Sequence, residues 1–119
     1  MFRFEPKPEV LWPVTIGVPA DKGLTTPHTV HVRYRVLPQE EIDEALRQPD
    51  DAAMLAAVVT GWGDDVLDEN GVPVPFTAEA LKSACRWSYV RVALVDGFFR
   101  AQAGARTKNS PTPPAAGPA

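Results

Sequence analysis

Two stretches of strict alternation constrain the fold of this chain more than any other feature of its sequence. In residues 10–18, and again in residues 29–36, every second residue is a large apolar one. A period of two places successive side chains on opposite faces of a strand, so each stretch predicts a strand with one buried face. Residues 19–27, which separate them, are rich in turn-forming residues. This arrangement predicts an antiparallel hairpin with a long, flexible loop.

The parity of the second stretch assigns its side chains to two faces. We expect one row to be buried against helices, namely Val30, Val32, Tyr34 and Val36, and the other row to face solvent, namely His31, Arg33 and Arg35. Pro13 interrupts the first stretch and cannot donate a ladder hydrogen bond, so it predicts a free edge or a bulge there. Phe2 and Phe4 share the parity of the first stretch and are candidates for a short third pairing.

The first two helices are predicted to follow the hairpin directly. One opens at Pro38 and directs Ile42 and Leu46, four residues apart, toward the core. Asp50 or Asp51 is the expected N-cap of the next helix, because either carboxylate can accept from the free N–H groups of a first turn. The apolar residues of that helix recur at helical spacing, and they are Met54, Leu55, Val58, Val59 and Trp62.

A turn-rich arm and a third helix are expected next. Asn70-Gly71 supplies the positive φ that a tight turn requires, so residues 61–77 are predicted to be an extended arm around that turn. Thr77 can accept a hydrogen bond from the first turn of a helix that we expect over residues 78–85.

The last helix is predicted over residues 89–103, with Ser88 as its N-cap and Gly104 as its C-terminal stop. At about 100° per residue its apolar side chains form two nearly opposite stripes. The first stripe is Val90, Leu94, Gly97, Phe98 and Ala101, and the second is Val92, Val95, Phe99 and Ala103. A helix that is apolar on both sides must be buried on both, within its own domain or against another chain. We expect the first stripe to pack inward and the second, with Trp87 nearby, to bind a partner.

The order of these elements predicts an α+β fold. An N-terminal antiparallel hairpin would form a small sheet, and about four helices would pack on one of its faces. The chain has 119 residues, of which 45% are hydrophobic, so residues 1–109 can form a single domain with one modest core. Residues 110–119 contain four prolines and no large apolar side chain, which predicts a disordered tail.

Deletion of residues 110–119 is expected to leave the melting temperature of the protein nearly unchanged. Nothing in this segment offers contacts that would offset the entropy cost of ordering it. Thermal unfolding of the full and the shortened chain, followed by circular dichroism, measures the effect. A fall of more than a few degrees would show that the tail docks on the domain.

The charge of the chain argues against nucleic acid and against an anionic membrane surface as its partner. Its formal net charge is -3, whereas either partner would demand clustered Lys and Arg. One local cluster of basic side chains is present, formed by Arg100, Arg106 and Lys108. We interpret it as a solvated helix end rather than a phosphate site. No stretch reaches the roughly 18 apolar residues of a membrane span, so we expect a cytoplasmic protein.

Neither a zinc site nor a calcium site is expected. His28 and His31 would lie on opposite faces of a strand, and no second pair of Cys or His completes a zinc site. If Gly71 is aligned with the invariant glycine of a calcium loop, Val66 and Thr77 occupy positions that require ligand oxygens. We therefore expect no cofactor, no metal and no enzymatic activity, and a protein that acts by binding.

The remaining notable side chains are expected to have structural roles. Cys85 is the single cysteine, which excludes an intramolecular disulfide, and we interpret it as a small core residue rather than a nucleophile. Trp62 and Trp87 are predicted to anchor the core, with a position in an interface as the alternative for Trp87.

The C-terminal half of the chain resembles the tail assembly chaperones of long-tailed bacteriophages. The resemblance rests on spaced features: Gly61-Trp62, an acidic turn at residues 68–71, the pattern Gly-x-Pro-x-Pro-Phe-Thr-x-Glu at residues 71–79, a Val-x-x-Ala-Leu helix segment at residues 90–94, and Lys108-Asn109. It implies a non-catalytic protein that binds the long, largely helical tape-measure protein, keeps it soluble and assists assembly of the tail tube.

This resemblance also implies that a frameshift-extended form can accompany the short one and contact the tail-tube subunit. Self-association into a homo-oligomer is a further expectation for the exposed helix stripe. The alternative function is that of another small phage or prophage structural or adaptor protein, such as a minor tail or connector component. A chaperone would be absent from purified particles, whereas such a component would be retained in the virion.

Overall fold

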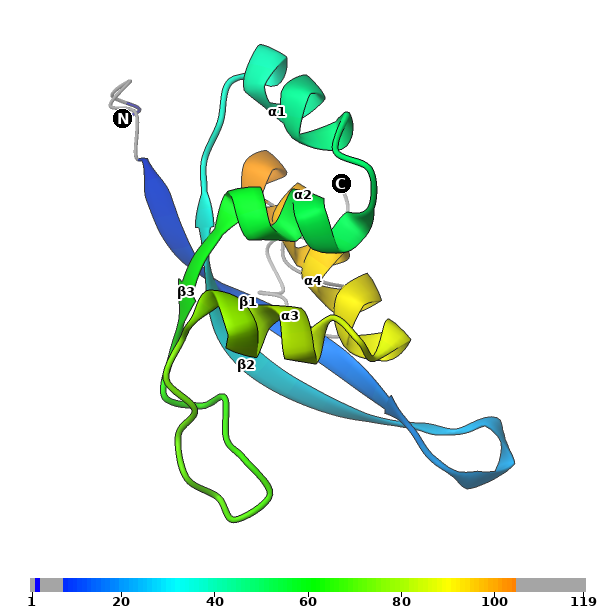
Figure 1. The fold of residues 1–119 in the computed structure, drawn as a ribbon. Helices are drawn as coiled ribbons and strands as arrows, with labels where there is room; N and C mark the ends of the chain where they lie inside the picture. The colour runs from blue at the N-terminus through cyan, green and yellow to red at the C-terminus, as the bar shows by residue number, and fades with distance from the viewer. Residues whose placement is uncertain (1, 3–7, 105–119) are drawn as a thin grey trace.

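The two alternating stretches form a long antiparallel hairpin in the computed structural model, which describes residue 2 and residues 8–104 (Figure 1). Strand β1 is Glu9–Pro19 and strand β2 is Thr25–Arg35, paired from Glu9 opposite Arg35 to Pro19 opposite Thr25. The expectations for Phe4, Arg106, Lys108 and residues 110–119 lie outside the described residues.

The hairpin loop is shorter than the sequence predicted. The pairing continues to Pro19 and Thr25, and the short 3-10 turn η1 (Asp21–Gly23) closes the hairpin. The Ala20 N–H donates to the carbonyl oxygen of Leu24 at 2.8 Å. The expectation of a long, flexible loop was wrong, because β-branched threonines extend β2 and a left-handed turn of two residues is enough to reverse the chain.

A third strand, β3 (Val59–Trp62), pairs antiparallel with β2, so the sheet has the order β1-β2-β3. The sequence had assigned Val59 and Trp62 to a helix, and this assignment was wrong. Helix α2 instead ends at Val58, where consecutive β-branched residues followed by Gly61 favour extended backbone. Phe2 is not in a strand and is 83% exposed.

Strand β1 lies at an edge of the sheet, as Pro13 predicted. His31, which lies opposite Pro13, directs its backbone groups away from β1: its N–H donates to Asp65 Oδ1 at 3.1 Å, and its carbonyl accepts from the Gly63 N–H at 2.8 Å. Because this pair exchanges no ladder hydrogen bond, the missing N–H of Pro13 costs nothing.

The predicted parity of β2 is confirmed. Val32 and Tyr34 are fully buried, and Val30 and Val36 are partly buried. On the other face Arg33 and Arg35 are exposed, while His31 is half-buried because of its contact with Asp65.

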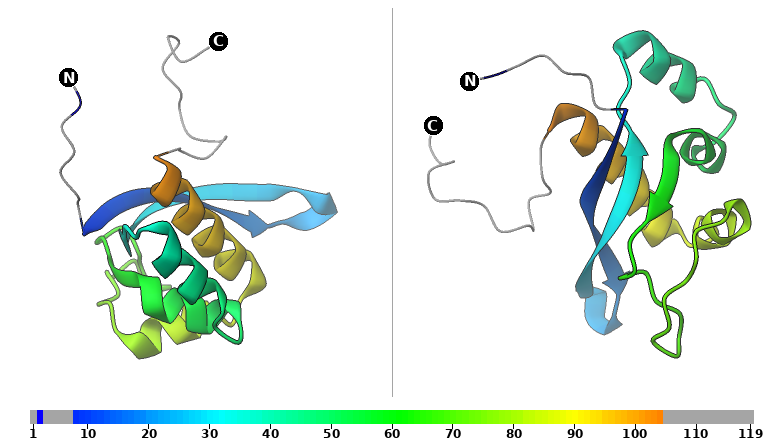
Figure 2. Two further views of the ribbon diagram at one scale, coloured as in Figure 1. Left: turned by 90° about the horizontal axis from the view of Figure 1, so that it is seen from above. Right: turned by 90° about the vertical axis from the view of Figure 1, so that its left-hand side faces the viewer.

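Within residues 8–104, four helices cover one face of the sheet, so the α+β fold is confirmed (Figure 2). They are α1 (Gln39–Leu46), α2 (Asp51–Val58), α3 (Ala78–Ala84) and α4 (Ser88–Ala103). Helix α4 packs directly on β1, α2 packs on α4, and α1 and α3 each pack on α2. In the described part of the chain no helix has the length and apolar character needed to cross a bilayer.

The helix caps agree with the sequence at three of four positions. Asp50 Oδ1 accepts from the Ala53 N–H at 2.8 Å, Thr77 Oγ1 accepts from the Ala80 N–H at 3.0 Å, and Gly104 ends α4 with φ 68°. Ser88 is not the N-cap of α4, because the helix already begins there and its hydroxyl contacts the guanidinium of Arg91 instead. The cap position belongs to Trp87, which makes no side-chain cap.

The inward face of α1 differs from the prediction. Ile42 packs on the core, but Leu46 is 51% exposed, and Ala45 is buried in its place. The inner side of this short helix is therefore formed by residues three apart, Ile42 and Ala45, rather than by residues four apart.

Candidate functional site

The inner stripe of α4 forms the centre of the core. Leu94, Phe98 and Ala101 are 3%, 0% and 7% exposed, and the ring of Phe98 lies 6.1 Å from the ring of Tyr34. The Tyr34 hydroxyl donates to the carbonyl oxygen of Leu94 at 2.7 Å, which ties α4 to the C-terminal end of β2. Burial raises the pKa of the Tyr34 hydroxyl well above its usual value, so it is protonated and able to donate.

The second stripe of α4 faces outward, and we call its members the outer face of α4. The members are Val92, Val95, Phe99 and Ala103. Val92 is 63% exposed and Phe99 is 41% exposed, Ala103 is exposed, and Val95 is partly buried at the border with the core. Other elements of the described chain therefore do not bury this stripe. The alternative, in which both stripes of α4 are buried within the domain, does not hold for Val92 and Phe99.

Trp87 and Trp62 have different environments. Trp87 immediately precedes α4 and is 61% exposed, so the expectation that it anchors the core was wrong. Trp62 packs on the core, stacks edge-to-face with Phe76 at 4.9 Å, and donates its indole N–H to the carbonyl oxygen of Val74 at 2.7 Å. The partly buried indole of Trp62 thus has a polar partner, whereas the side chain of Trp87 is open to solvent.

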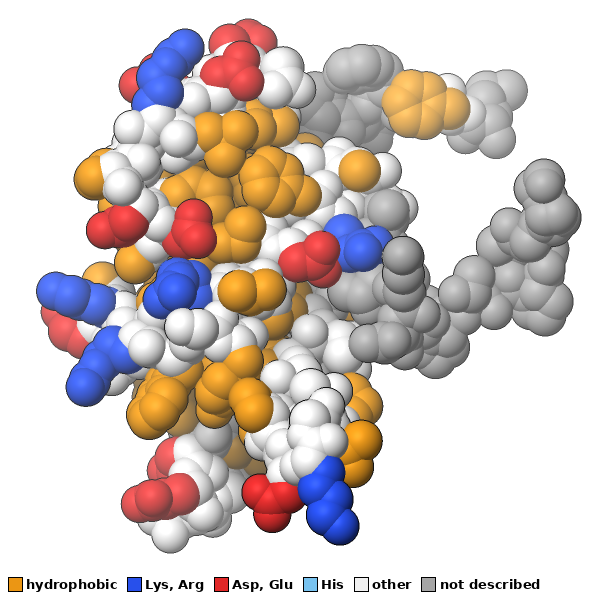
Figure 3. Space-filling model, turned by 90° about the vertical axis from the view of Figure 1, so that its right-hand side faces the viewer, with side chains coloured by type: hydrophobic (Ala, Val, Ile, Leu, Met, Phe, Trp, Pro, Cys, Tyr) orange, Lys and Arg blue, Asp and Glu red, His pale blue; other side chains and the backbone are white. Residues whose placement is uncertain are grey.

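A shallow groove adjoins the outer face of α4. It has a volume of about 490 Å³ and runs between β1 and the first half of α4, lined by Thr15, Gly17, Ser88, Tyr89, Val92, Ala93 and Asp96. Sequence reasoning missed it, although a glycine inside a strand is a signal for close approach of another group. On the side of the molecule shown in Figure 3, hydrophobic side chains gather in patches separated by charged ones.

Polar contacts fix the position of α4 within the domain. Gln102 makes two of them: its side-chain oxygen accepts from the Leu37 N–H at 2.9 Å, and its side-chain nitrogen donates to the Arg35 carbonyl at 2.7 Å. Arg100 pairs with Asp96 at 2.9 Å, one turn away on the same helix. The bridging role of Gln102 was not predicted from the sequence.

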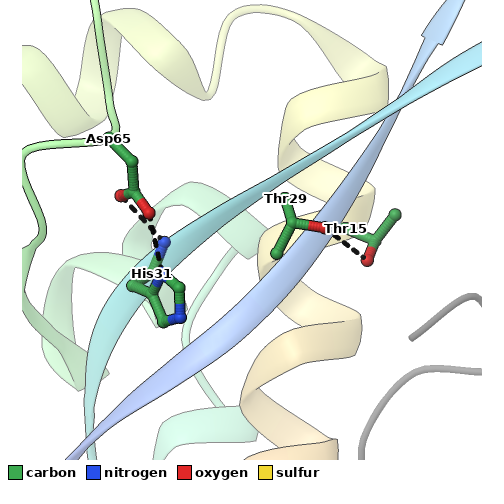
Figure 4. Close-up of polar contacts among 4 residues, drawn as sticks. All are labelled: Thr15, Thr29, His31 and Asp65. Carbon is green, nitrogen blue, oxygen red and sulfur yellow. Dashed lines mark hydrogen bonds and ion pairs between the residues drawn. The ribbon is translucent and has the colours of Figure 1, made fainter. Parts of the chain in front are cut away.

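The loop after β3 is held to the outer face of the sheet by His31 and Asp65 (Figure 4). His31 Nδ1 and Asp65 Oδ2 lie 2.7 Å apart, and nearby Thr15 and Thr29 contact each other through their hydroxyls at 3.5 Å. Partial burial raises the pKa of the Asp65 carboxyl, but the hydrogen bonds from His31 outweigh it and hold that pKa below its usual value.

The described residues offer few groups for catalysis. They contain no group of three or more His, Cys, Asp or Glu side chains placed to hold a metal ion. Cys85 is a buried core residue, as expected, and burial raises the pKa of its thiol against the opposing influence of Arg91. His28 and His31 are three residues apart on β2 and so belong to opposite faces of the strand.

Comparison of the chain with models of protein families, with curated proteins and with solved structures found no match. The function must therefore be inferred from the residues and their geometry. The outer face of α4 places the exposed apolar side chains of Val92 and Phe99 on one regular helix of 16 residues.

Proposed function

We propose that the protein is a tail assembly chaperone of a long-tailed phage or prophage, which binds the tape-measure protein through the outer face of α4 and Trp87. The observation that supports it is the exposure of Val92 and Phe99 on one side of α4, whose other side is core, together with the exposure of Trp87 just before the helix. The resemblance of the C-terminal half to tail assembly chaperones supplies the identity of the partner.

A helical partner suits this surface. Val92, Val95 and Phe99 are spaced by three and four residues, the spacing at which one helix packs its side chains against another. Full burial of an exposed Val or Phe side chain contributes about 1.5–3 kcal/mol. A long helical protein that exposes apolar stripes before assembly would be kept soluble by such contacts, and the chaperone would leave when the tail tube replaces it.

Phe99→Asp is expected to abolish solubilisation of the tape-measure protein without unfolding the chaperone. The side chain is half exposed, so the carboxylate stays hydrated in the free protein but would be buried without a partner in the complex. Co-expression with the tape-measure protein, followed by measurement of its soluble fraction, tests this. Leu24→Asp is the matched control, because Leu24 is 65% exposed at the hairpin tip, remote from α4.

The two variants separate the proposal from its alternatives. The proposal is supported if Phe99→Asp loses solubilisation of the tape-measure protein while its circular dichroism is unchanged and Leu24→Asp still solubilises it. It is contradicted if both variants solubilise the tape-measure protein fully. A minor tail or connector protein would instead remain in purified particles, which mass spectrometry of virions detects. Self-association through the same face would appear as a change in sedimentation that Phe99→Asp removes.

A further inference from the structure

The loop between β3 and α3 exposes an asparagine followed by a glycine at its tip. Asn70 and Gly71 are both exposed, and Gly71 has a left-handed backbone with φ 77°. Glycine carries no side chain that would hinder attack by its backbone nitrogen on a neighbouring group. The residue before it, Asn70, carries such a group in its side-chain amide.

Asp68 accepts hydrogen bonds from three consecutive N–H groups of this tip. Its carboxylate Oδ1 accepts from the N–H groups of Asn70 at 2.8 Å and of Val72 at 3.0 Å. Its backbone carbonyl accepts from the N–H of Gly71 at 3.0 Å. The Gly71 nitrogen is therefore engaged in the turn, and the flanking residues Leu67 and Pro73 form a bridge across its base.

We propose that Asn70 is a site of spontaneous modification to aspartate and isoaspartate, and that Asp68 sets its rate. The backbone nitrogen of Gly71 loses its proton to a solvent base and attacks the side-chain carbonyl carbon of Asn70. A carbon–nitrogen bond forms, the side-chain nitrogen takes up a proton, and it leaves as ammonia. Water then opens the five-membered ring at either carbonyl, and no oxidant or reductant is required.

The contacts of Asp68 oppose the first step. Attack requires the Gly71 nitrogen to give up its hydrogen bond and to turn toward the Asn70 side chain, while Asp68 Oδ1 fixes the N–H groups on both sides of Gly71. Without this carboxylate the tip samples more conformations, including those in which the nitrogen reaches the amide carbon.

The products would alter the loop. Either product adds one negative charge to a formal net charge of -3, beside Asp68 and Glu69, where like charges repel. Isoaspartate also inserts one extra methylene into the main chain between residues 70 and 71. The Gly71 and Val72 N–H groups then no longer fit both acceptors on Asp68, and the turn opens. Modification would thus convert a closed loop into an open one.

The test compares the native chain with Asp68→Ala and Asp68→Asn during incubation at mildly alkaline pH, where the attacking nitrogen ionises more readily. Peptide mass spectrometry measures the conversion of amide to acid at residue 70. We expect Asp68→Ala to accelerate it on the order of tenfold, a factor that corresponds to about 1.4 kcal/mol. Asp68→Asn keeps a side-chain acceptor and should remain close to the native rate.

Two controls make the result decisive. Asn109, which precedes a serine in the same chain, is an internal reference whose conversion should not differ between the variants. Asn70→Gln should abolish the signal at residue 70, because its longer side chain forms the ring poorly. Equal rates in the native chain and in Asp68→Ala would overturn the proposal, as would the absence of conversion at Asn70 in both.

Discussion

Phe98→Asp is expected to unfold the domain, whereas Phe99→Asp, one residue further along α4, is expected to leave it folded. Phe98 is 0% exposed and packs on Tyr34, while Phe99 is 41% exposed. Loss of a buried Phe side chain alone costs about 3–5 kcal/mol, and an unpaired carboxylate in the cavity adds a desolvation cost. The sum is comparable to the whole stability of a small domain, about 5–15 kcal/mol.

Circular dichroism and thermal unfolding of both variants measure this difference directly. The adjacent positions form a matched pair, because the substitution, the helix and the change in charge are the same and only the face of α4 differs. Equal unfolding by both variants would mean that both stripes are core. The binding surface would then have to be sought around Trp87 and the turn of residues 64–71.

Features encoded by local sequence were predictable. Each of these features depends only on residues close to it in the sequence. They are the parity of β2, the caps at Asp50 and Thr77, and the C-terminal stop of α4 at Gly104. The division of α4 into an inner and an outer stripe likewise follows from helical geometry alone. In such cases the local preference and the final packing favour the same structure.

Strand β3 could not be recognised in this way. Its residues Val59 and Trp62 continue the helical spacing of α2, and a strand of four residues is too short to show alternation. What selects the extended form is pairing with β2, where Tyr34 lies opposite Val59 and Val32 opposite Trp62. This information lies about 25–30 residues away in the sequence, so a local pattern does not contain it.

The candidate site shows the same division. The exposed stripe was predicted from the sequence of α4 alone. The adjoining groove could not be, because β1 forms its other side. The contacts of Gln102 could not be predicted either, because their partners are backbone groups of residues 35 and 37. Trp87 was assigned to the core because large aromatic residues usually are. Its position at the junction of α3 and α4 instead leaves it at the surface.

Gly97→Ala is expected to destabilise the domain, although alanine favours a helix over glycine by about 1 kcal/mol. A Cβ at this position would lie 2.6 Å from the Tyr34 hydroxyl oxygen and 2.7 Å from Val14 Cγ2. Both side chains are fully buried, so neither can move without disturbing the core, and overpacking of this kind costs about 1–3 kcal/mol. Glycine therefore allows α4 to lie close against the sheet.

A double-mutant cycle that combines Gly97→Ala with Tyr34→Phe tests whether the Tyr34 hydroxyl oxygen is the atom that the new methyl group crowds. Tyr34→Phe alone removes the hydrogen bond to Leu94, worth about 0.5–1.5 kcal/mol. In the Gly97→Ala background the same change also removes the oxygen nearest the new methyl group, so the double variant should lose less stability than the sum of the single variants. Urea unfolding measures all four chains. If Gly97→Ala were stabilising, α4 would lie farther from the sheet than this structure places it, and the inner stripe would not be the tightly packed side of the helix.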